Sequence, residues 1–275
     1  MSKFRKIKNA IFTFVVVFFA LIAVLPLICI VVVLVLKGFP VLLEKGSSFL
    51  TAPLSEGGIG PAIVGSAILT CLSGVIGVPI AVLVGIHVYE YPKSFLGKWA
   101  RLLLQIMMEF PTILVGVFVM GIIVVPMGRY SAIAGAIALS LILIPYVAVY
   151  TTEALREIPF TYKEAAYSIG LTKSKVIFNV MLPMARKGVI TGILIGLAKA
   201  AGETAPLLFT AGGLYEVFPK SVTKPIGAIP LLIYNLVQSP SSYDHAIAWG
   251  ASLILMLISL SIFTPLRVLI KEVKL

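Results

Sequence analysis

Six long apolar stretches divide this chain, and each is long enough to cross a lipid bilayer. They cover about residues 11–36, 62–88, 101–126, 131–150, 188–210 and 246–267. A spanning helix needs about 20 mainly apolar residues to cross about 30 Å of hydrocarbon. Only 12% of the residues are charged, against about 25% in ordinary soluble domains. The sequence therefore predicts an all-α polytopic membrane protein, with residues 1–275 forming a single transmembrane domain.

The basic residues between these stretches predict an orientation. If both termini lie inside the cell, 16 of the 22 Lys and Arg residues fall in inner segments, five fall in outer segments, and Lys199 lies within a span. Cytoplasmic segments of membrane proteins carry an excess of Lys and Arg. We therefore expect both termini and segment 151–187 in the cytoplasm. Because the net charge of +11 is distributed between apolar stretches, we do not expect nucleic-acid binding.

The chain contains no recognisable catalytic or metal-binding motif. Its two cysteines and two histidines are isolated, without metal-ligand spacing. No GxxxxGK[ST] loop for ATP phosphates is present, and no nucleophile–base arrangement is apparent. We therefore expect no metal, no cofactor and no catalytic residue in this chain. Any energy-requiring activity would then depend on a partner or on an ion gradient.

Segment 151–187 is the one long polar connection, and it contains a predicted short helix. In TYKEAAYSIG, Thr161 is placed to cap a helix and Gly170 to end it. Two interpretations are open, a solvated basic loop or a docking element. The small residues Ala165 and Ala166 would let a partner approach the backbone closely, which favours docking.

The same segment resembles the EAA signature of ABC-importer permeases. That signature is EAA, three residues, Gly, nine residues, an aliphatic residue, one more residue, and Leu-Pro. The matching residues are Glu164, Ala165, Ala166, Gly170, Val180, Leu182 and Pro183. The resemblance implies that a helix at about 161–172 docks in a cleft of a separate ATPase subunit, which binds ATP and Mg²⁺. It also implies that the EAA residues, Gly170 and Leu182-Pro183 couple the two subunits.

Two charged residues lie inside the fifth predicted span. Lys199 is eleven residues beyond Gly188, so at ~1.5 Å per residue it lies roughly 16 Å into the helix. Lys199 and Glu203 are four residues apart and share one helix face. They could form a structural ion pair, or Lys199 could attract an anion while Glu203 tunes its release. Intramembrane charges usually face a cavity or a partner.

Other residues near this pair extend the candidate pathway. Gly202 and Pro206 flank the pair and are expected, with Thr204, to loosen the helix, as transporter binding sites often require. Glu109 precedes a proline in the third span. It could accept a hydrogen bond from a neighbouring helix or line the pathway, and both interpretations remain open.

The stretch AKAAGETAPLLFTA, residues 198–211, closely resembles the signature of PstA-type permeases of phosphate ABC importers. The clear resemblance covers about residues 145–213. It implies a MetI-like permease fold, a homologous second permease, two ATPase subunits, an extracytoplasmic phosphate-binding protein and surrounding lipid, in a prokaryotic inner membrane. Lys199 stands where we expect Arg more often in this family, and lysine lacks the bidentate geometry of arginine.

Three alternative functions are compatible with the sequence. The first is the same machine carrying molybdate, sulfate or phosphonate. The second is a channel or an ion-coupled secondary transporter that uses Lys199 and Glu203 as a relay, although no internal repeat supports it. The third is a regulatory membrane component without flux of its own.

Overall fold

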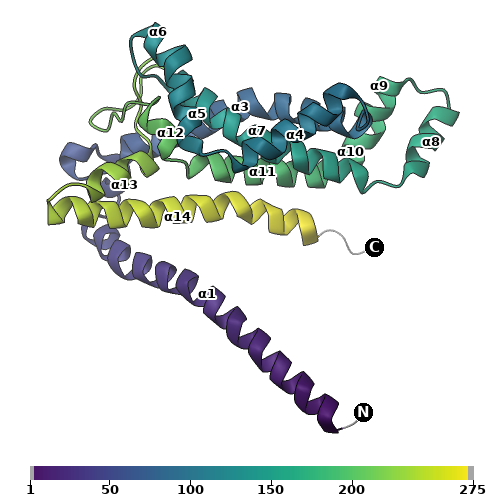
Figure 1. The fold of residues 1–275 in the computed structure, drawn as a ribbon. Coiled ribbons are helices and arrows are strands. Elements are labelled where there is room, and N and C mark those ends of the chain that lie inside the picture. Colours follow the sequence, from purple (N-terminus) through teal and green to yellow (C-terminus); the bar gives the residue numbers. More distant parts are fainter. Residues whose placement is uncertain (1–2, 272–275) are drawn as a thin grey trace.

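Long apolar helices make up most of the chain in the computed structural model, which describes residues 3–271 (Figure 1). Residues 1–2 and 272–275 of the predicted domain lie outside the described part. Among the described helices, four are each long and apolar enough to cross a membrane, and the number rises to six if two bent pairs each form one span. The four are α1 (Lys3–Lys45), α3 (Gly60–Glu90), α7 (Ala132–Arg156) and α14 (Ser242–Lys271).

The first bent pair joins α4 (Phe95–Glu109) to a second helical stretch, and the two directions differ by 104°. The second stretch consists of α5 (Thr112–Val119), the π-helical segment η2 (Met120–Val124) and α6 (Val125–Met127). The other pair joins residues 173–184 to α11 (Arg186–Ala201) at an angle of 73°. Residues 173–184 comprise α9 (Lys173–Lys175), the π-helical segment η3 (Val176–Met181) and α10 (Leu182–Met184).

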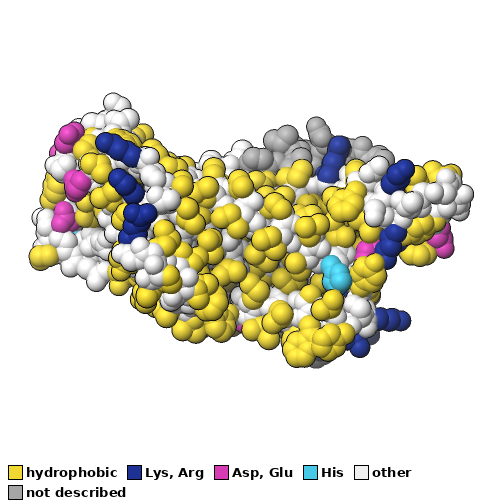
Figure 2. Space-filling model, turned by 90° about the horizontal axis from the view of Figure 1, so that it is seen from above, with side chains coloured by type: hydrophobic (Ala, Val, Ile, Leu, Met, Phe, Trp, Pro, Cys, Tyr) yellow, Lys and Arg dark blue, Asp and Glu magenta, His cyan; other side chains and the backbone are white. Residues whose placement is uncertain are grey.

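Short helices complete the chain at the two ends of the molecule. They are α2 (Ser48–Thr51), η1 (Leu54–Glu56), α8 (Phe160–Ser168), α12 (Ala205–Leu208) and α13 (Ile229–Val237). Helices α3, α4, α7 and α11 run side by side between these ends, with α8 and α9 at one end and α6, α12 and α13 at the other (Figure 1). On the face drawn in Figure 2, hydrophobic side chains cover the middle, and most charged side chains gather toward the two ends.

Helix α7 is the most buried of the long helices, and α3 and α11 pack against it. Close approach of α11 depends on glycines spaced four residues apart. A Cβ added at Gly188 would lie 2.4 Å from the Cβ of Ala154, and one added at Gly192 would lie 2.4 Å from the Cβ of Tyr150. Small residues at helix contacts let backbones approach and gain van der Waals contact, which drives helix association in membranes. A larger side chain at either glycine would push the two helices apart.

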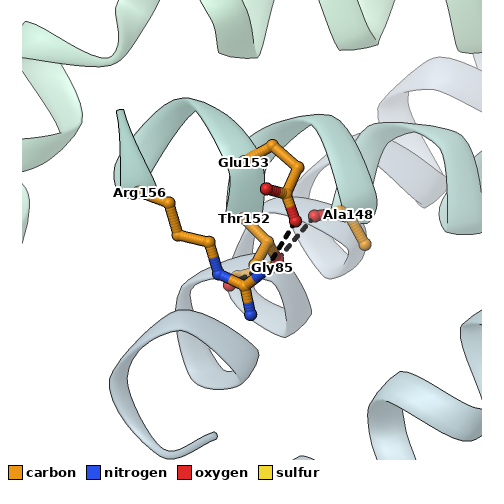
Figure 3. A network of polar contacts seen from close by, with 5 residues as sticks. All are labelled: Gly85, Ala148, Thr152, Glu153 and Arg156. Carbon is orange, nitrogen blue, oxygen red and sulfur yellow. Dashed lines mark hydrogen bonds and ion pairs between the residues drawn. The ribbon is translucent and has the colours of Figure 1, made fainter. Parts of the chain in front are cut away.

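A buried hydroxyl joins α7 to α3 near one end of the molecule. The Thr152 hydroxyl lies within hydrogen-bond distance of the Gly85 carbonyl, at 3.0 Å, and of the Ala148 carbonyl, at 2.9 Å (Figure 3). The neighbouring Arg156 donates to Glu153 at 2.7 Å, but both side chains are exposed. Exposed ion pairs contribute about 0.2–1 kcal/mol. The bond from Thr152 is therefore the more informative contact, because it connects two helices.

Three predicted ranges differ from the observed helices for identifiable reasons. The stretch at 101–126 is not one helix, because Phe110 is extended and Pro111 begins a new direction. Residues 37–45, which lie beyond the predicted first span at 11–36, continue α1, where Gly38 approaches the backbone of Trp249 on α14 and Lys37 lies over its ring. Residues 151–156, expected in a polar segment, form the last turns of α7.

Candidate functional site

Helix α8 carries the EAA residues and ends earlier than predicted. It covers Phe160–Ser168 rather than 161–172, and Thr161 does not cap it. The Gly170 N–H donates to the carbonyl of Tyr167 at 2.9 Å, and the Leu171 N–H donates to that of Ala166 at 3.2 Å. These two bonds form a Schellman motif, in which the residue after the helix adopts a left-handed conformation. Gly170 has φ +81°, a value that glycine adopts without strain.

The four EAA-region residues do not all face outward. Glu164, Ala165 and Gly170 are exposed, whereas Ala166 is buried. The prediction that both alanines are open to a partner is therefore wrong for Ala166. Its methyl group belongs to a buried cluster with Val176, Ile177 and Met181, so its small size permits close packing of α8 on η3. Glu164 and Ala165 remain the exposed pair that a partner could contact.

Leu182 and Pro183 lie on α10, immediately before the 73° bend into α11. Leu182 is half-buried against the cluster that contains Ala166, and Pro183 is exposed. The same cluster includes Ile86 of α3 and Val189 of α11. Because Ala154 and Leu155 of α7 also belong to this cluster, the segment that carries the EAA motif is packed onto α3, α7 and α11 and does not stand apart as a free loop.

A buried carboxylate at the end of α3 also holds this segment, and no sequence motif indicates it. Glu90, whose side chain is 2% exposed, accepts from Lys163 of α8 at 2.5 Å and lies 3.2 Å from Lys173 of α9. Lys163 also lies 5.0 Å from the ring centre of Tyr89, and Lys173 lies 4.0 Å from that of Tyr91. The available sequence signal was an acidic residue between two tyrosines at the end of an apolar span.

The second candidate region lies where α11 ends. Gly202 caps α11 after Ala201, and the next helix, α12, carries Pro206 at its second position. The predicted range 188–210 is therefore not one continuous helix. A proline cannot donate a backbone hydrogen bond, and its ring clashes with the carbonyl four residues earlier, here that of Gly202. Pro206 also packs against Gly116 of α5, where an added Cβ would lie 2.6 Å from the Pro206 Cα.

Lys199 and Glu203 meet across this break. Their Nζ and Oε1 atoms are 2.6 Å apart, and the lysine side chain is 44% exposed whereas that of the glutamate is 8% exposed. Lys199 lies in the last turn of α11, where a cation is favoured by the partial negative charge of the helix end. The buried carboxylate is thus neutralised by a cation that also reaches the open surface. An incoming anion could contact that cation from outside.

Gly202 and Thr204 line a groove of about 420 Å³ beside the break. Its other walls come from α1, α13 and α14, and include Ser252 and Ser259. Those two hydroxyls donate to carbonyls of their own helix. The groove contains no charged side chain among the residues that line it, so the charge of this region is concentrated at Lys199 and Glu203.

Glu109 lies at the end of α4, directly before the 104° bend, and it is exposed. Within residues 3–271, no hydrogen bond or ion pair to its carboxylate is observed. The structural interpretation, in which Glu109 accepts from a neighbouring helix of this chain, is therefore not observed. The pathway interpretation stays a prediction.

Comparison with known proteins shows the family to which this chain belongs. A family model described as binding-protein-dependent transport system inner membrane component matches residues 77–274. The chain belongs to this family. Family membership and the apolar helices make it a multi-pass membrane protein.

Two relatives of this family member match it over nearly its whole length. A protein of Methanocaldococcus jannaschii named "Probable phosphate transport system permease protein PstA" is 60% identical over 268 residues, covering 98% of this chain and 95% of the relative. A Pasteurella multocida protein named "Phosphate transport system permease protein PstA" is 38% identical over 267 residues, covering 94% of each.

Solved structures agree on the fold of this family member. A chain of the inward-facing MetNI methionine ABC transporter matches with a TM-score of 0.61 at 20% identity, covering 77% of this chain and 95% of that one. A chain of an amino acid ABC transporter matches with a TM-score of 0.51 at 17% identity, covering 76% and 91%. The predicted MetI-like permease fold is therefore confirmed.

Proposed function

We propose that this chain is the transmembrane permease subunit of an ATP-driven importer that carries inorganic phosphate into a prokaryotic cell. The observation that carries the proposal is the 60% identity over 98% of the chain to a protein named as a phosphate transport permease. The permease fold supports the same class of machine. The chain itself is then a transport subunit rather than an enzyme.

In this proposal the partner ATPase docks on α8. The support is the exposure of Glu164 and Ala165 on a short helix that is fixed to the body by a buried cluster. A docking helix must present a free face and must also pass on its displacement, and the exposed face of α8 and its packing on the cluster support both. ATP and Mg²⁺ would bind to the ATPase. Two such subunits, a homologous second permease and an extracytoplasmic phosphate-binding protein would complete the importer.

The proposed orientation places α8 and α9 in the cytoplasm. Its support is the excess of basic residues in the segments assigned to the inside. The first turns of α1 and the last turns of α14 point toward the same side as α8 (Figure 1), as an even number of crossings requires. Both termini would then lie in the cytoplasm.

The proposed pathway for the anion passes Lys199. Phosphate released outside would compete with Glu203 for the lysine, whose side chain is half-exposed. A bound anion would lose that contact when Glu203 takes the cation back, so the pair would favour both entry and release. Thr204 and Gly202, where α11 ends, would line the same pathway. Glu109 would line it from the end of α4.

Uptake by the complete transporter tests the substrate. Proteoliposomes that contain the permease pair and its ATPase, supplied with binding protein, are given ATP inside and radiolabelled phosphate outside. We expect uptake that requires ATP and that excess sulfate, molybdate or phosphonate does not reduce. Preferential uptake of sulfate would contradict the phosphate assignment. Uptake that continues when the ATPase is inactivated would favour an ion-coupled transporter or a channel.

A further inference from the structure

Tyr89, Glu90 and Tyr91, at the end of α3, contact the segment that carries the EAA motif on both sides of the turn at Gly170. Lys163 precedes Gly170 and Lys173 follows it, and both ammonium groups reach the single carboxylate of Glu90. The flanking tyrosine rings lie beneath the same two cations. The contact therefore fixes α8 and α9 to α3, and to each other.

The position of Glu90 is unfavourable for a carboxylate without these lysines. It is the last residue of α3, where the helix carries partial negative charge. Its side chain is 2% exposed, and burial of an unpaired charge is costly. The contrast is Glu153, which pairs with Arg156 on the same helix while exposed to solvent. The ion pair of Glu153 lies within α7, whereas the ion pairs of Glu90 connect α3, α8 and α9.

The route through Glu90 is more direct than the route along the chain. From α8, the backbone passes a left-handed glycine, the π-helical segment η3 and a 73° bend before α11 begins. The ion pair between Lys163 and Glu90 connects α8 directly to the end of α3. There the bond from Thr152 to the Gly85 carbonyl connects α3 to α7, so a displacement of α8 has a short path into the centre of the molecule.

We propose that Glu90 is a positioning residue that locks α8 to the end of α3, so that both move together when the ATPase closes. This inference rests on the proposed docking of the ATPase at α8. Loss of the negative charge would leave α8 attached only by its apolar cluster and by the chain. ATP hydrolysis would then continue while less of its movement reached the transmembrane helices.

The test is Glu90→Gln in the complete transporter, which keeps the shape of the side chain and removes its charge. Phosphate uptake and ATP hydrolysis are measured together in proteoliposomes. We expect the ATPase subunit to stay bound, ATP hydrolysis to continue, and the phosphate carried per ATP to fall by about tenfold. Glu153→Gln is the matched control, because it makes the same change at the same end of the molecule, and we expect an unchanged ratio.

A second variant keeps the inference testable if Glu90→Gln does not assemble. Replacing Glu90, Lys163 and Lys173 together by Gln removes the contact and leaves no unpaired charge, and we expect the same loss of coupling. An unchanged ratio of phosphate to ATP in an assembled variant would overturn the inference. Loss of the ATPase subunit from an assembled variant would also overturn it, because Glu90 would then shape the docking face and not transmit its movement.

The failure of this inference can be distinguished from the failure of the docking proposal. Glu164→Arg is measured in the same preparation, because Glu164 is exposed on α8 and the ion pairs of Glu90 seen in residues 3–271 are with Lys163 and Lys173. If Glu164→Arg retains the ATPase and normal uptake, the docking proposal fails. If Glu164→Arg releases the ATPase while Glu90→Gln couples normally, docking stands and the role of Glu90 is refuted.

Discussion

The pair formed by Lys199 and Glu203 allows a prediction that separates a structural role from contact with the anion. Lys199→Ala leaves a carboxylate that is 8% exposed without its partner. Breaking a fully buried pair costs about 3–5 kcal/mol, and an exposed pair contributes about 0.2–1 kcal/mol. Because the lysine is 44% exposed, we expect an intermediate cost of about 1–3 kcal/mol. The single variant should therefore assemble less well.

Removing both charges separates the two roles. In the double variant Lys199→Ala with Glu203→Ala, no buried charge is left unpaired, so we expect assembly to recover. Transport should not recover if the lysine contacts phosphate. A hydrogen bond to a charged group contributes about 1.5–3 kcal/mol, which corresponds to roughly 10–150-fold in rate at 1.4 kcal/mol per factor of ten. We therefore expect uptake to fall by at least about tenfold.

The assay is the initial rate of radiolabelled phosphate uptake, normalised to the amount of assembled transporter. Lys199→Arg is the matched control, because it keeps the cation and adds bidentate geometry for an oxyanion, and we expect it to retain uptake. If the double variant assembles and imports phosphate at the parental rate, the pair is purely structural and the proposed pathway is wrong at Lys199.

Three further predictions concern the docking face and the helix contacts. Glu164→Arg should release the ATPase subunit on co-purification without changing the thermal midpoint of the permease, since exposed substitutions usually change stability by less than about 0.5 kcal/mol; retained ATPase would contradict docking. Gly170→Ala should cost about 1–2 kcal/mol in left-handed backbone strain and speed proteolysis of α8; unchanged cleavage would argue against the observed turn. Gly192→Ala should lower the thermal midpoint, because its Cβ would lie 2.4 Å from that of Tyr150 and overpacking costs about 1–3 kcal/mol. Gly121→Ala is the control, because a Cβ added at Gly121 would meet no atom of another element within 4 Å, and it should leave the thermal midpoint unchanged.

Hydropathy and local motifs were sufficient for the fold class and for much of the site. The ranges 62–88, 131–150 and 246–267 all fall within α3, α7 and α14, apart from one residue at the start of α7. Hydropathy measures how apolar a window is and contains no information on direction. The 104° bend at Phe110 was therefore not predicted, although Pro111 provided a local signal because proline disfavours a helical conformation in the residue before it.

The missed parts of the site depend on contacts between distant residues. Glu90 and Lys163 are 73 positions apart, and no local pattern indicates that they meet. The direction of Ala166 depends on how α8 lies on η3, which the sequence of α8 alone does not specify. By contrast, Gly170 was predicted to end its helix, because the conformational requirement for glycine after a helix is local.

The π-helical segment η3 has a consequence for insertions and deletions. Each residue of an α-helix turns the chain by about 100°, and a π-helical turn contains one residue more than an α-helical one. The six residues Val176–Met181 therefore set the angular relation between α8 and the helix that carries Lys199. Deletion of a single residue there would convert the turn to α-helical geometry and rotate one end by about 100° relative to the other. Lysines of α8 and α9 could then no longer reach Glu90 while α11 kept its glycines against α7. The number of residues in this segment is thus constrained in addition to the apolar character of Val176, Ile177 and Met181, and homologous permeases should not vary in that number.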